Sequence, residues 1–338
     1  MSPSIPISPH VLQISPAVET DRIVAGIRDI VLRQLKRKGA VVAVSGGVDS
    51  SVVASLCTRA LGRDRVLLLL MPETDSSPDS LRLGRLVAES LQVRAVVEDI
   101  SPLLIAARSY QRRDDAVRMV APEYKEGYKC KIVLPDVVNE DRYSVFSVVV
   151  QTPDGCTEKI RLSLEAYLGV VAATNCKQRA RKLFEYYYAD QLQYAVAGTP
   201  NRLEHELGFF VKNGDGAADF KPIAHLFKSQ VFQLAEYLEV PAEIRTRPPT
   251  TDTYSLEQTQ EEFYFSLPLE KMDFCLYAYH AGISAEDLAP AVGLTARQAE
   301  RAYRAIESRH RAARYLAAPP LLIEPVDSRR GESHETQR

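Results

Sequence analysis

The chain contains three short runs of almost continuously apolar residues, at 40–44, 66–71 and 93–97. The stretches between them, 50–61 and 78–91, place apolar residues at helical spacing. Strands that are apolar on both faces are typical of parallel sheets covered by helices on both sides. This β-α-β-α-β order predicts an α/β fold built on a doubly wound parallel sheet.

Outside this alternation the pattern changes along the chain. Residues 1–20 carry four prolines and are predicted to form an N-terminal arm. Residues 122–168 contain strand-like runs around a turn at 153–155, which predicts a β-rich insert within a single domain spanning 21–325. Residues 326–338 are polar and predict a tail without fixed structure. Further helices, including a helical C-terminal part, are expected at 177–193, 228–239, 268–280, 284–291 and 295–316.

The composition excludes several classes of function. With 42 Lys and Arg against 44 Asp and Glu, the 338-residue chain has a formal net charge of −2, which disfavours broad nucleic-acid binding. No apolar run approaches the ~20 residues that span a bilayer, and the N-terminus lacks the basic and apolar regions of a secretory signal. The five cysteines form no C-x-x-C pair, so we expect free thiols in a cytoplasmic protein with no membrane and no nucleic-acid partner.

One segment, VVAVSGGVDSSVVASL at 41–56, combines a strand end, two glycines and a helix start. Adjacent glycines allow a tight turn that points backbone N–H groups at one place, and the helix start adds unpaired N–H groups. Such a nest suits a pyrophosphate, while a carboxylate within it suits Mg²⁺. The predicted ATP-binding residues of this loop are Ser45, Gly46, Gly47, Val48, Asp49, Ser50 and Ser51.

The SGGVDS segment resembles the pyrophosphate loop, SGGxDS, of the N-type ATP pyrophosphatases. The resemblance implies cleavage of ATP between its α- and β-phosphates and formation of an acyl or imidoyl adenylate. This superfamily includes ammonia-dependent NAD synthetases, GMP synthetases, asparagine synthetases and tRNA-modifying enzymes, and the loop alone does not choose among them.

A second segment, GTPNRLEHELGFFVKNGDGAADFKP at 198–222, resembles the NAD synthetase signature. Thr199 follows a strand-like run, so we expect it at the carboxyl edge of the sheet, where ligands bind in open α/β folds, and we expect it to bind ATP. Glu204 is expected to hold Mg²⁺ beside Asp49. The loop residues expected to contact the substrate are Lys212, Asp215 and Asp219.

Further segments are similar to the NAD synthetase family in the same order along the chain. The resemblance implies that Arg179 contacts deamido-NAD and that Lys228 contacts an ATP phosphate. It also implies that Thr250 reaches ATP and that His310 and Arg311 contact the substrate. The matching segments are 175–181, 226–231, 248–252 and 307–311, within a resemblance that covers roughly 21–105 and 174–315.

The resemblance implies an ATP-dependent amide ligase that converts deamido-NAD to NAD with ammonia, through an acyl-adenylate, and releases AMP and pyrophosphate. ATP is the implied co-substrate and Mg²⁺ the implied metal, with Asp49, Glu204 and Lys228 as catalytic residues. About 20 residues precede the first synthetase helix, so we expect free ammonia, or ammonia from a separate subunit, rather than a fused glutaminase domain. The family's acid pocket lies at a two-fold interface, which implies a homodimer. Candidate interface residues on the helix of Arg179 are Phe184, Tyr187 and Tyr188.

Three departures from the family keep a second acid substrate open. Pro200 replaces a residue that would offer an N–H, the segment 260–265 differs from the family pattern, and the 122–168 insert is absent from compact members. We expect the insert to pack on the body or on a partner near Arg179. A paralogue that amidates another carboxylic acid is therefore the alternative. A tRNA-thiolating enzyme lacks support because there is no C-x-x-C, and a nucleotide sensor without catalysis is disfavoured by charged residues in register.

Overall fold

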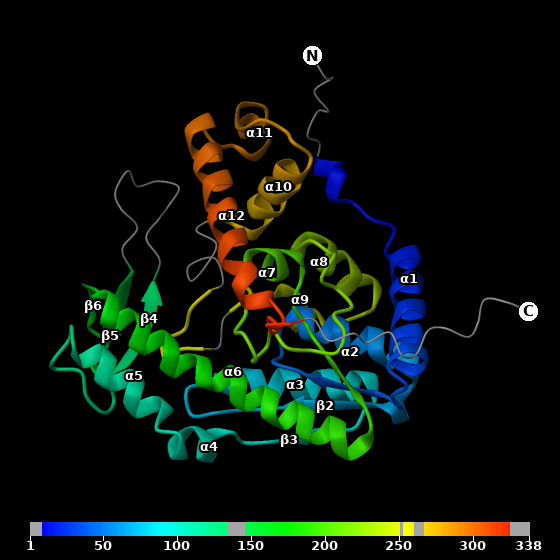
Figure 1. Cartoon of the computed structure of the whole chain (residues 1–338), viewed down its shortest axis with the longest axis horizontal. Coiled ribbons are helices and arrows are strands. Elements are labelled where there is room, and N and C mark those ends of the chain that lie inside the picture. The colour runs from blue at the N-terminus through cyan, green and yellow to red at the C-terminus, as the bar shows by residue number, and fades with distance from the viewer. Residues whose placement is uncertain (1–8, 134–145, 251–252, 260–266, 325–338) are drawn as a thin grey trace, which may run out of the picture.

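The computed structural model describes residues 9–133, 146–250, 253–259 and 267–324. Its centre is a four-stranded parallel sheet in the order β3-β2-β1-β7 (Figure 1). These strands are β1 (Ala40–Ala43), β2 (Val66–Leu70), β3 (Ala95–Val97) and β7 (Ala195–Ala197). From β1, the chain adds β2 and then β3 on one side of the sheet, and β7 pairs with the other side of β1. The predicted α/β fold with a doubly wound sheet is confirmed.

Helices cover both faces of this sheet. One layer consists of α1 (Pro16–Arg28), α2 (Val48–Leu61), α3 (Pro78–Leu91) and α8 (Lys228–Tyr237). The other layer consists of α4 (Ser101–Ala106) and α6 (Leu164–Leu192). Val42 and Leu68 point into the first layer, Val41 and Leu67 point into the second, and all four are buried. Continuously apolar strands follow from this double burial.

The boundaries of the first helices follow local capping chemistry. Helix α1 begins at Pro16, so the end of the expected N-terminal arm is helical, and it continues as a π-helical segment, Asp29–Gln34. Helix α2 begins directly after the glycine turn, and Gly62 ends it with a φ of 87°, which glycine tolerates best. The side chain of Ser77 accepts a hydrogen bond from the backbone of the first turn of α3.

The β-rich insert forms a separate antiparallel sheet, at the left of Figure 1. Its strands are β4 (Lys129–Val133), β5 (Ser147–Gln151) and β6 (Thr157–Arg161). One face packs on α5 (Ser109–Arg118) and on the first turns of α6, where Ile132, Val148 and Val170 are buried together. The insert therefore packs on the body of the chain, as predicted. Residues 134–145, which the prediction also included, lie outside the described residues.

Helix α6 differs from its prediction at the N-terminal end. It runs for 29 residues from Leu164, instead of starting at residue 177, so the last residues of the predicted insert are helical. Ser163 caps the helix by accepting a hydrogen bond from a first-turn N–H. Arg179 consequently lies in the middle of the helix rather than at its start. The first turns of α6 contain β-branched residues, which have low helix propensity. Packing of Val170 against the insert stabilises the helix there.

The C-terminal part is helical, as predicted. Its helices are α7 (Arg202–Leu207), α9 (Ala242–Thr246), α10 (Leu269–His280), α11 (Ala285–Val292) and α12 (Ala296–Ala317). Helices α7, α10, α11 and α12 share an apolar cluster in which Leu12 from the N-terminal segment is also buried. Among the described residues, no helix has the length and apolar character needed to cross a membrane. The segment 260–265 and the tail 326–338 lie outside the described residues.

Candidate active site

A cavity of about 950 Å³ opens at the carboxyl ends of β1 and β7. The strand order reverses between these two strands, which is where ligands bind in open α/β folds. Its walls are the loop after β1, the middle of α6, the segments after β7 and α9, and α12. Thr199, which directly follows β7, lines it. The two sequence signatures, predicted separately, therefore face one space.

The glycine-serine loop after β1 depends on glycine at one position. Gly46 has a φ of 79°, and a Cβ there would lie 2.7 Å from the Cβ of Leu83. The hydroxyls of Ser50 and Ser51 both donate to the carbonyl of Gly47, at 3.0 and 2.8 Å. Ser51 is fully buried and does not line the cavity, so it braces the start of α2. The predicted loop residues that do line the cavity are Ser45, Gly46, Gly47, Val48, Asp49 and Ser50.

The carboxylate of Asp49 meets groups from α8 and from the segment after β7. Lys228 Nζ forms an ion pair with Asp49 Oδ2, and Asn201 Nδ2 donates to Asp49 Oδ1 at 3.1 Å. The side chain of Lys228 is 2% exposed and that of Asp49 is 15% exposed. Burial disfavours the charged form of Lys228, but the carboxylates of Asp49 and Glu204 outweigh it and raise the pKa of Lys228. A buried, charged ammonium therefore stands at this edge of the cavity.

Glu204 lies in the first turn of α7, where it forms a capping box with Asn201. Glu204 Oε2 accepts a hydrogen bond from the N–H of Asn201 at 3.1 Å, and Asn201 Oδ1 accepts one from the N–H of Glu204 at 3.2 Å. Asn201 thus connects Glu204 to Asp49, and the structure brings Asp49, Glu204 and Lys228 together. The sequence prediction did not assign a role to Asn201, although Asn three residues before Glu is a helix-start signal.

Asp273 on α10 holds the start of α8 in place. Its carboxylate oxygens accept hydrogen bonds from the backbone N–H groups of Lys228 and Ser229, at 3.2 and 2.7 Å. Burial raises the pKa of Asp273 to about 6, although these hydrogen bonds oppose the shift. Since this contact fixes the first residue of α8, it also fixes where the Lys228 side chain enters the cavity.

Helix α6 lines the cavity through residues other than Arg179, for which a substrate contact was predicted. Its cavity-lining polar residues include Asn175, Gln178, Arg181, Lys182 and Glu185. Arg179 is exposed, and its Nε donates to the carbonyl of Lys212 at 3.3 Å. Because successive helical residues are rotated by about 100°, Gln178 faces the cavity while Arg179 points away from it. Lys182 and Glu185 form a buried ion pair at 2.7 Å, and burial raises the pKa of Glu185.

The glycine-rich loop within 208–222 places one of its predicted residues at the cavity. Asp215 lines the cavity, and burial raises its pKa. Lys212 points to the end of α12, where its Nζ donates to the carbonyl of Tyr315 at 2.8 Å and lies 4.3 Å from the centre of that ring. Asp219 accepts a hydrogen bond from an N–H of β7 at 2.7 Å. Lys212 and Asp219 therefore support neighbouring elements in this structure.

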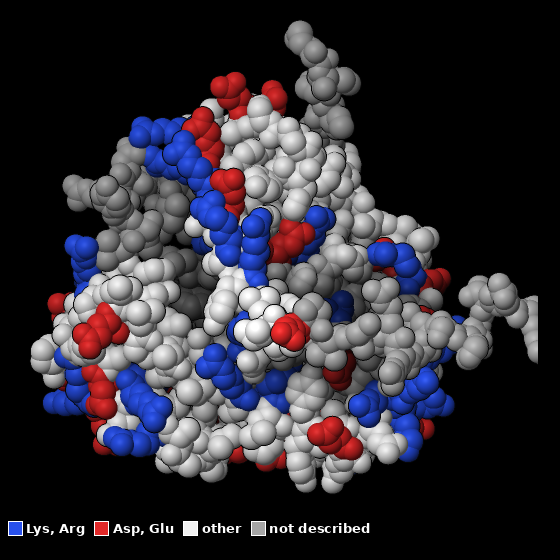
Figure 2. Space-filling view, viewed as in Figure 1, with Lys and Arg blue, Asp and Glu red and all other residues white. Residues whose placement is uncertain are grey.

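Helix α12 supplies a basic wall that the sequence prediction missed. Figure 2 shows basic side chains gathered along this helix. Its cavity-lining residues include Arg301, Arg304, Ser308 and Arg309. The two residues predicted instead, His310 and Arg311, do not line the cavity: Arg311 is exposed, and His310 Nε2 lies 3.6 Å from Glu206 Oε2. Arginines at spacings of three and five residues on one helix were the available signal.

The insert and the segment after α9 complete the walls. Ile132 and Phe146 from the insert line the cavity, and the Phe146 ring stacks on Tyr167 with centroids 3.9 Å apart. Thr250 and Arg247 line it from the segment after α9. The predicted contact of Thr250 with ATP is compatible with this position. The insert therefore contributes directly to the shape of the cavity.

A buried ionic network adjoins these walls. The side chain of Lys177 is 2% exposed, and its Nζ donates to Glu73 Oε1 at 2.9 Å and to Asp75 Oδ2 at 2.6 Å. The same ammonium donates to the carbonyl of Thr253, a cavity-lining residue, at 2.8 Å. Lys177 thus ties α6 to the loop after β2 and to the segment after α9. The contacts compensate charges that would otherwise be costly to bury.

Comparison with known proteins decides the family. The model of the NAD synthase family matches residues 19–132 and 151–315. The chain belongs to the NAD synthase family. The resemblance inferred from the sequence is confirmed, and the gap in the match falls inside the insert of this NAD synthase-family protein.

Curated relatives are similar over most of their length. The NH(3)-dependent NAD(+) synthetase of Rhizobium meliloti (strain 1021) is 55% identical over 320 residues, which cover 95% of this chain and 96% of the relative. The NH(3)-dependent NAD(+) synthetase of Thermotoga neapolitana is 37% identical over 243 residues, which cover 72% of this chain and 78% of the relative.

Solved structures share the fold of this NAD synthase-family protein. The NMN synthetase from Francisella tularensis superposes with a TM-score of 0.63 at 22% identity, covering 92% of this chain and 99% of that chain. The NH3-dependent NAD synthetase from Campylobacter jejuni superposes with a TM-score of 0.60 at 21% identity, covering 92% of this chain and 100% of that chain. At these identities the likeness concerns the fold alone.

Proposed function

We propose that this protein is an ATP-dependent amide ligase that converts deamido-NAD to NAD with ammonia and releases AMP and pyrophosphate. One observation carries the proposal: Asp49 of the SGGVDS loop and Asn201 of the second signature, 152 residues apart, join at one cavity. Relatives named NH(3)-dependent NAD(+) synthetase are 52–55% identical to this chain. The alternative, amidation of a different carboxylic acid, gains no support from these relatives.

ATP is proposed to place its triphosphate against the loop after β1. The turn at Gly46 and Gly47 and the N-terminus of α2 offer backbone N–H groups and a positive dipole end to phosphate oxygens. The ammonium of Lys228 adds a full positive charge from a buried position. These groups stabilise charge that develops as the substrate carboxylate attacks the α-phosphorus and pyrophosphate leaves. Ammonia then attacks the acyl-adenylate and AMP departs.

Mg²⁺ is the metal that the donor set fits. Asp49 and Glu204 bring carboxylate oxygens to one edge of the cavity, and Mg²⁺ prefers such oxygens together with phosphates and water. These two residues would hold it, and when bound it would neutralise negative charge on the triphosphate. Asn201 orients both carboxylates through its amide and its backbone N–H.

The acid substrate is proposed to occupy the part of the cavity between α6 and α12. Arginine guanidiniums on α12 offer two-pronged hydrogen bonds to phosphates of a dinucleotide. Asp215 and the Lys182–Glu185 pair supply charged groups on the opposite wall. No protein nucleophile is required, since ammonia attacks the adenylate directly. Enclosure by these walls would protect the adenylate from water.

A homodimer is proposed from the exposed side of α6. Of the predicted interface residues, Phe184 and Tyr188 pack toward the sheet, while Tyr187 is 55% exposed. Other exposed apolar residues of α6 are Leu164, Leu168 and Leu183. A second copy seated on α6 would cover them and approach Arg179, whose predicted contact with substrate stays a prediction. Sedimentation of Leu183→Glu against wild type tests this, and a monomeric, fully active wild type would contradict it.

The proposed setting is the cytoplasm, with ammonia taken either free or from a separate donor subunit. All five cysteines are free thiols, which is typical of a reducing compartment. Burial raises the pKa of Cys57 and of Cys275 to about 12, so neither serves as the thiolate of a glutaminase. Ammonium is therefore expected to support turnover, and glutamine alone to give none.

The proposal is tested by measuring AMP and amide product with purified protein, ATP, Mg²⁺ and ammonium. Deamido-NAD and nicotinic acid mononucleotide are supplied separately, and equal amounts of AMP and NAD are expected with deamido-NAD. Asp49→Asn and Glu204→Gln are each expected to abolish AMP formation, whereas Asp64→Asn, at an exposed position, is not. AMP formation restricted to a different acid, or none with either, would overturn the proposal.

A further inference from the structure

A cluster of potential metal ligands lies outside the walls of the cavity. Glu206, His280 and His310 each offer one ligand atom, and these atoms lie within 4.8 Å of one another. They come from three helices that are distant in the sequence, α7, α10 and α12. None of the three residues lines the active-site cavity. The proposed ligase reaction therefore leaves this cluster without a role.

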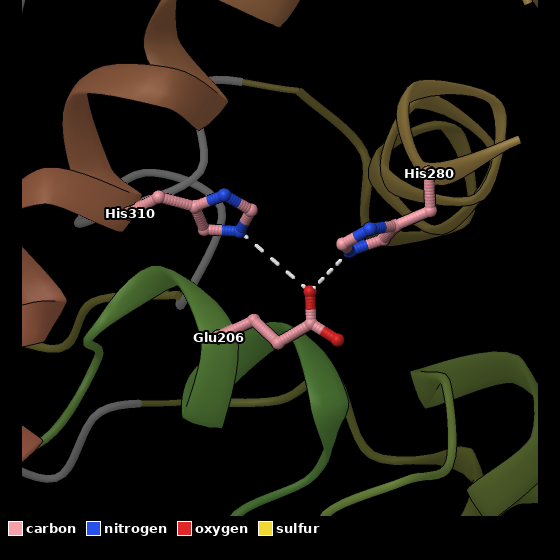
Figure 3. Close-up of side chains that lie close together, drawn as sticks. All are labelled: Glu206, His280 and His310. Atoms are coloured by element: carbon pink, nitrogen blue, oxygen red, sulfur yellow. Dashed lines mark hydrogen bonds and ion pairs between the residues drawn. The ribbon is translucent and has the colours of Figure 1, made fainter. Parts of the chain in front are cut away.

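Both imidazoles point at the same carboxylate oxygen. His280 Nε2 lies 2.5 Å from Glu206 Oε2, and His310 Nε2 lies 3.6 Å from it (Figure 3). The two Nε2 atoms and Glu206 Oε2 thus lie close together. The backbones that carry them belong to helices that pack on one another. Two histidines and one glutamate form a ligand set that zinc uses, with a fourth position left for water.

One of these nitrogens is buried without a hydrogen-bond partner. His310 Nε2 is excluded from solvent, yet at 3.6 Å from Glu206 Oε2 it is too far for a hydrogen bond. Buried polar atoms nearly always have a hydrogen-bond partner or a metal ligand role, so a buried nitrogen without a partner indicates a missing ligand. Ligands around tetrahedral zinc are roughly 3.3 Å apart, which lies between the two nitrogen–oxygen distances seen here. A metal ion would give His310 Nε2 its missing partner.

The surroundings already hold the carboxylate in position. Arg202 Nε donates to the other oxygen, Glu206 Oε1, at 2.5 Å, which leaves Oε2 facing the histidines. The guanidinium of Arg202 lies 4.6 Å from the centre of the Phe227 ring, so it is itself fixed by packing. Tyr279 contacts both imidazoles edge-on, with ring centroids 5.8 Å away in each case. Such outer contacts orient metal ligands.

We propose that Glu206, His280 and His310 form a binding site for one zinc-type transition-metal dication. An ion there would link α7, which begins at the Asn201–Glu204 capping box, to α12, which carries the arginine wall of the cavity. The site is thus placed to fix α12 relative to the catalytic edge. Arg202 neutralises part of the glutamate charge, so binding is expected near micromolar Kd rather than at the strength of cysteine-rich zinc sites.

The test is titration of the full-length, chelator-treated protein with Zn²⁺ and, separately, with Co²⁺, both in excess Mg²⁺ to occupy hard-oxygen sites. The expected result is one saturable site per chain, a rise in Tm on adding Zn²⁺, and visible absorption typical of tetrahedral Co²⁺. If the wild-type protein shows no saturable binding at metal concentrations up to about a hundred times the expected Kd, the proposal is overturned. This outcome depends on the wild type alone, so it does not require any variant to fold.

Matched variants locate the site. His280→Ala and His310→Ala are each expected to weaken binding at least about tenfold and to remove the Co²⁺ absorption. His225→Ala is the control, since His225 is an exposed histidine that likewise pairs with a glutamate, Glu19, far from the cluster. If an alanine variant fails to fold, Glu206→Gln, which keeps the side-chain shape, carries the same expectation. Unchanged binding in the folded variants, or equal loss in His225→Ala, would contradict the assignment.

Discussion

Two parts of the cavity differ in how their side chains are positioned: the catalytic edge, formed by the loop after β1 with Asp49, Glu204 and Lys228, and the walls formed by α6 and α12. At the edge, residues 45–50 follow a strand directly, and the turn geometry of Gly46 fixes where each group points. On the walls, direction depends on the rotation of long helices, so Gln178 faces the cavity while Arg179 does not. Local turn chemistry can thus be interpreted from sequence, whereas on a helix a shift of one residue changes which side chain faces the cavity.

The largest effect is expected at the edge, from Lys228→Ala. Removing this buried ammonium takes away a charge aimed at the triphosphate, so kcat should fall by about a hundredfold or more. Steady-state AMP release measures it. Lys129→Ala, at an exposed position of β4, is the control and should keep wild-type turnover. A Lys228→Ala enzyme within threefold of wild type would show that the edge does not act through this residue.

Lys177→Met, on α6, is expected to lower the stability of the protein strongly, because Lys177 ties α6 to the loop after β2. The change leaves the carboxylates of Glu73 and Asp75 buried without their ammonium partner, at a cost of about 3–5 kcal/mol in the free energy of unfolding. Urea unfolding measures the loss, with Lys129→Met as the exposed control. A loss of less than about 1 kcal/mol in Lys177→Met would show that the network does not hold the wall as described.

A smaller, selective effect is expected from the insert, through Phe146→Ala. The ring stacks on Tyr167 and lines the cavity, so its loss should raise the KM for deamido-NAD by about three- to tenfold, the scale of one aromatic contact. The KM for ATP should stay near wild type. Val149→Ala, in the strand β5 that follows Phe146 but not lining the cavity, serves as control. Equal changes in both KM values would place the insert outside the acid pocket.

The smallest effect is a pH dependence of stability at Asp273. Burial raises the pKa of Asp273 to about 6, above the ~3.9 of an unfolded aspartate. The folded state therefore binds more protons between these values, and this group's contribution to stability falls as pH rises from about 4 to about 6. Relative to Asp273→Asn, the wild type should lose unfolding free energy across that window and run parallel above it. Parallel curves throughout would contradict the raised pKa.

Much of the fold could be predicted because its strands are apolar on both faces and its first helices carry local stop signals. Among the elements missed, α4, α7 and α9 have five or six residues each, too few to show a helical period, whereas α5, also missed, has ten. The start of α6 was missed because its β-branched residues are stabilised by the insert, a contact that no local pattern reveals. Asp273 and the contact of Asn201 with Asp49 were missed for the same reason, since the partners are distant in sequence.

The proposed reaction can be followed through the carboxylate oxygen of deamido-NAD that becomes bonded to the α-phosphorus of ATP. If the carboxylate of deamido-NAD attacks the α-phosphorus and ammonia then attacks the adenylate, one carboxylate oxygen must leave with AMP. Deamido-NAD labelled with heavy oxygen in its carboxylate, ATP, Mg²⁺ and ammonium are incubated with the wild-type protein, and AMP is analysed by mass spectrometry. We expect one labelled oxygen in AMP for each NAD formed, and no label in pyrophosphate. NAD formed without labelled AMP, or no NAD formed at all, would contradict the proposed function.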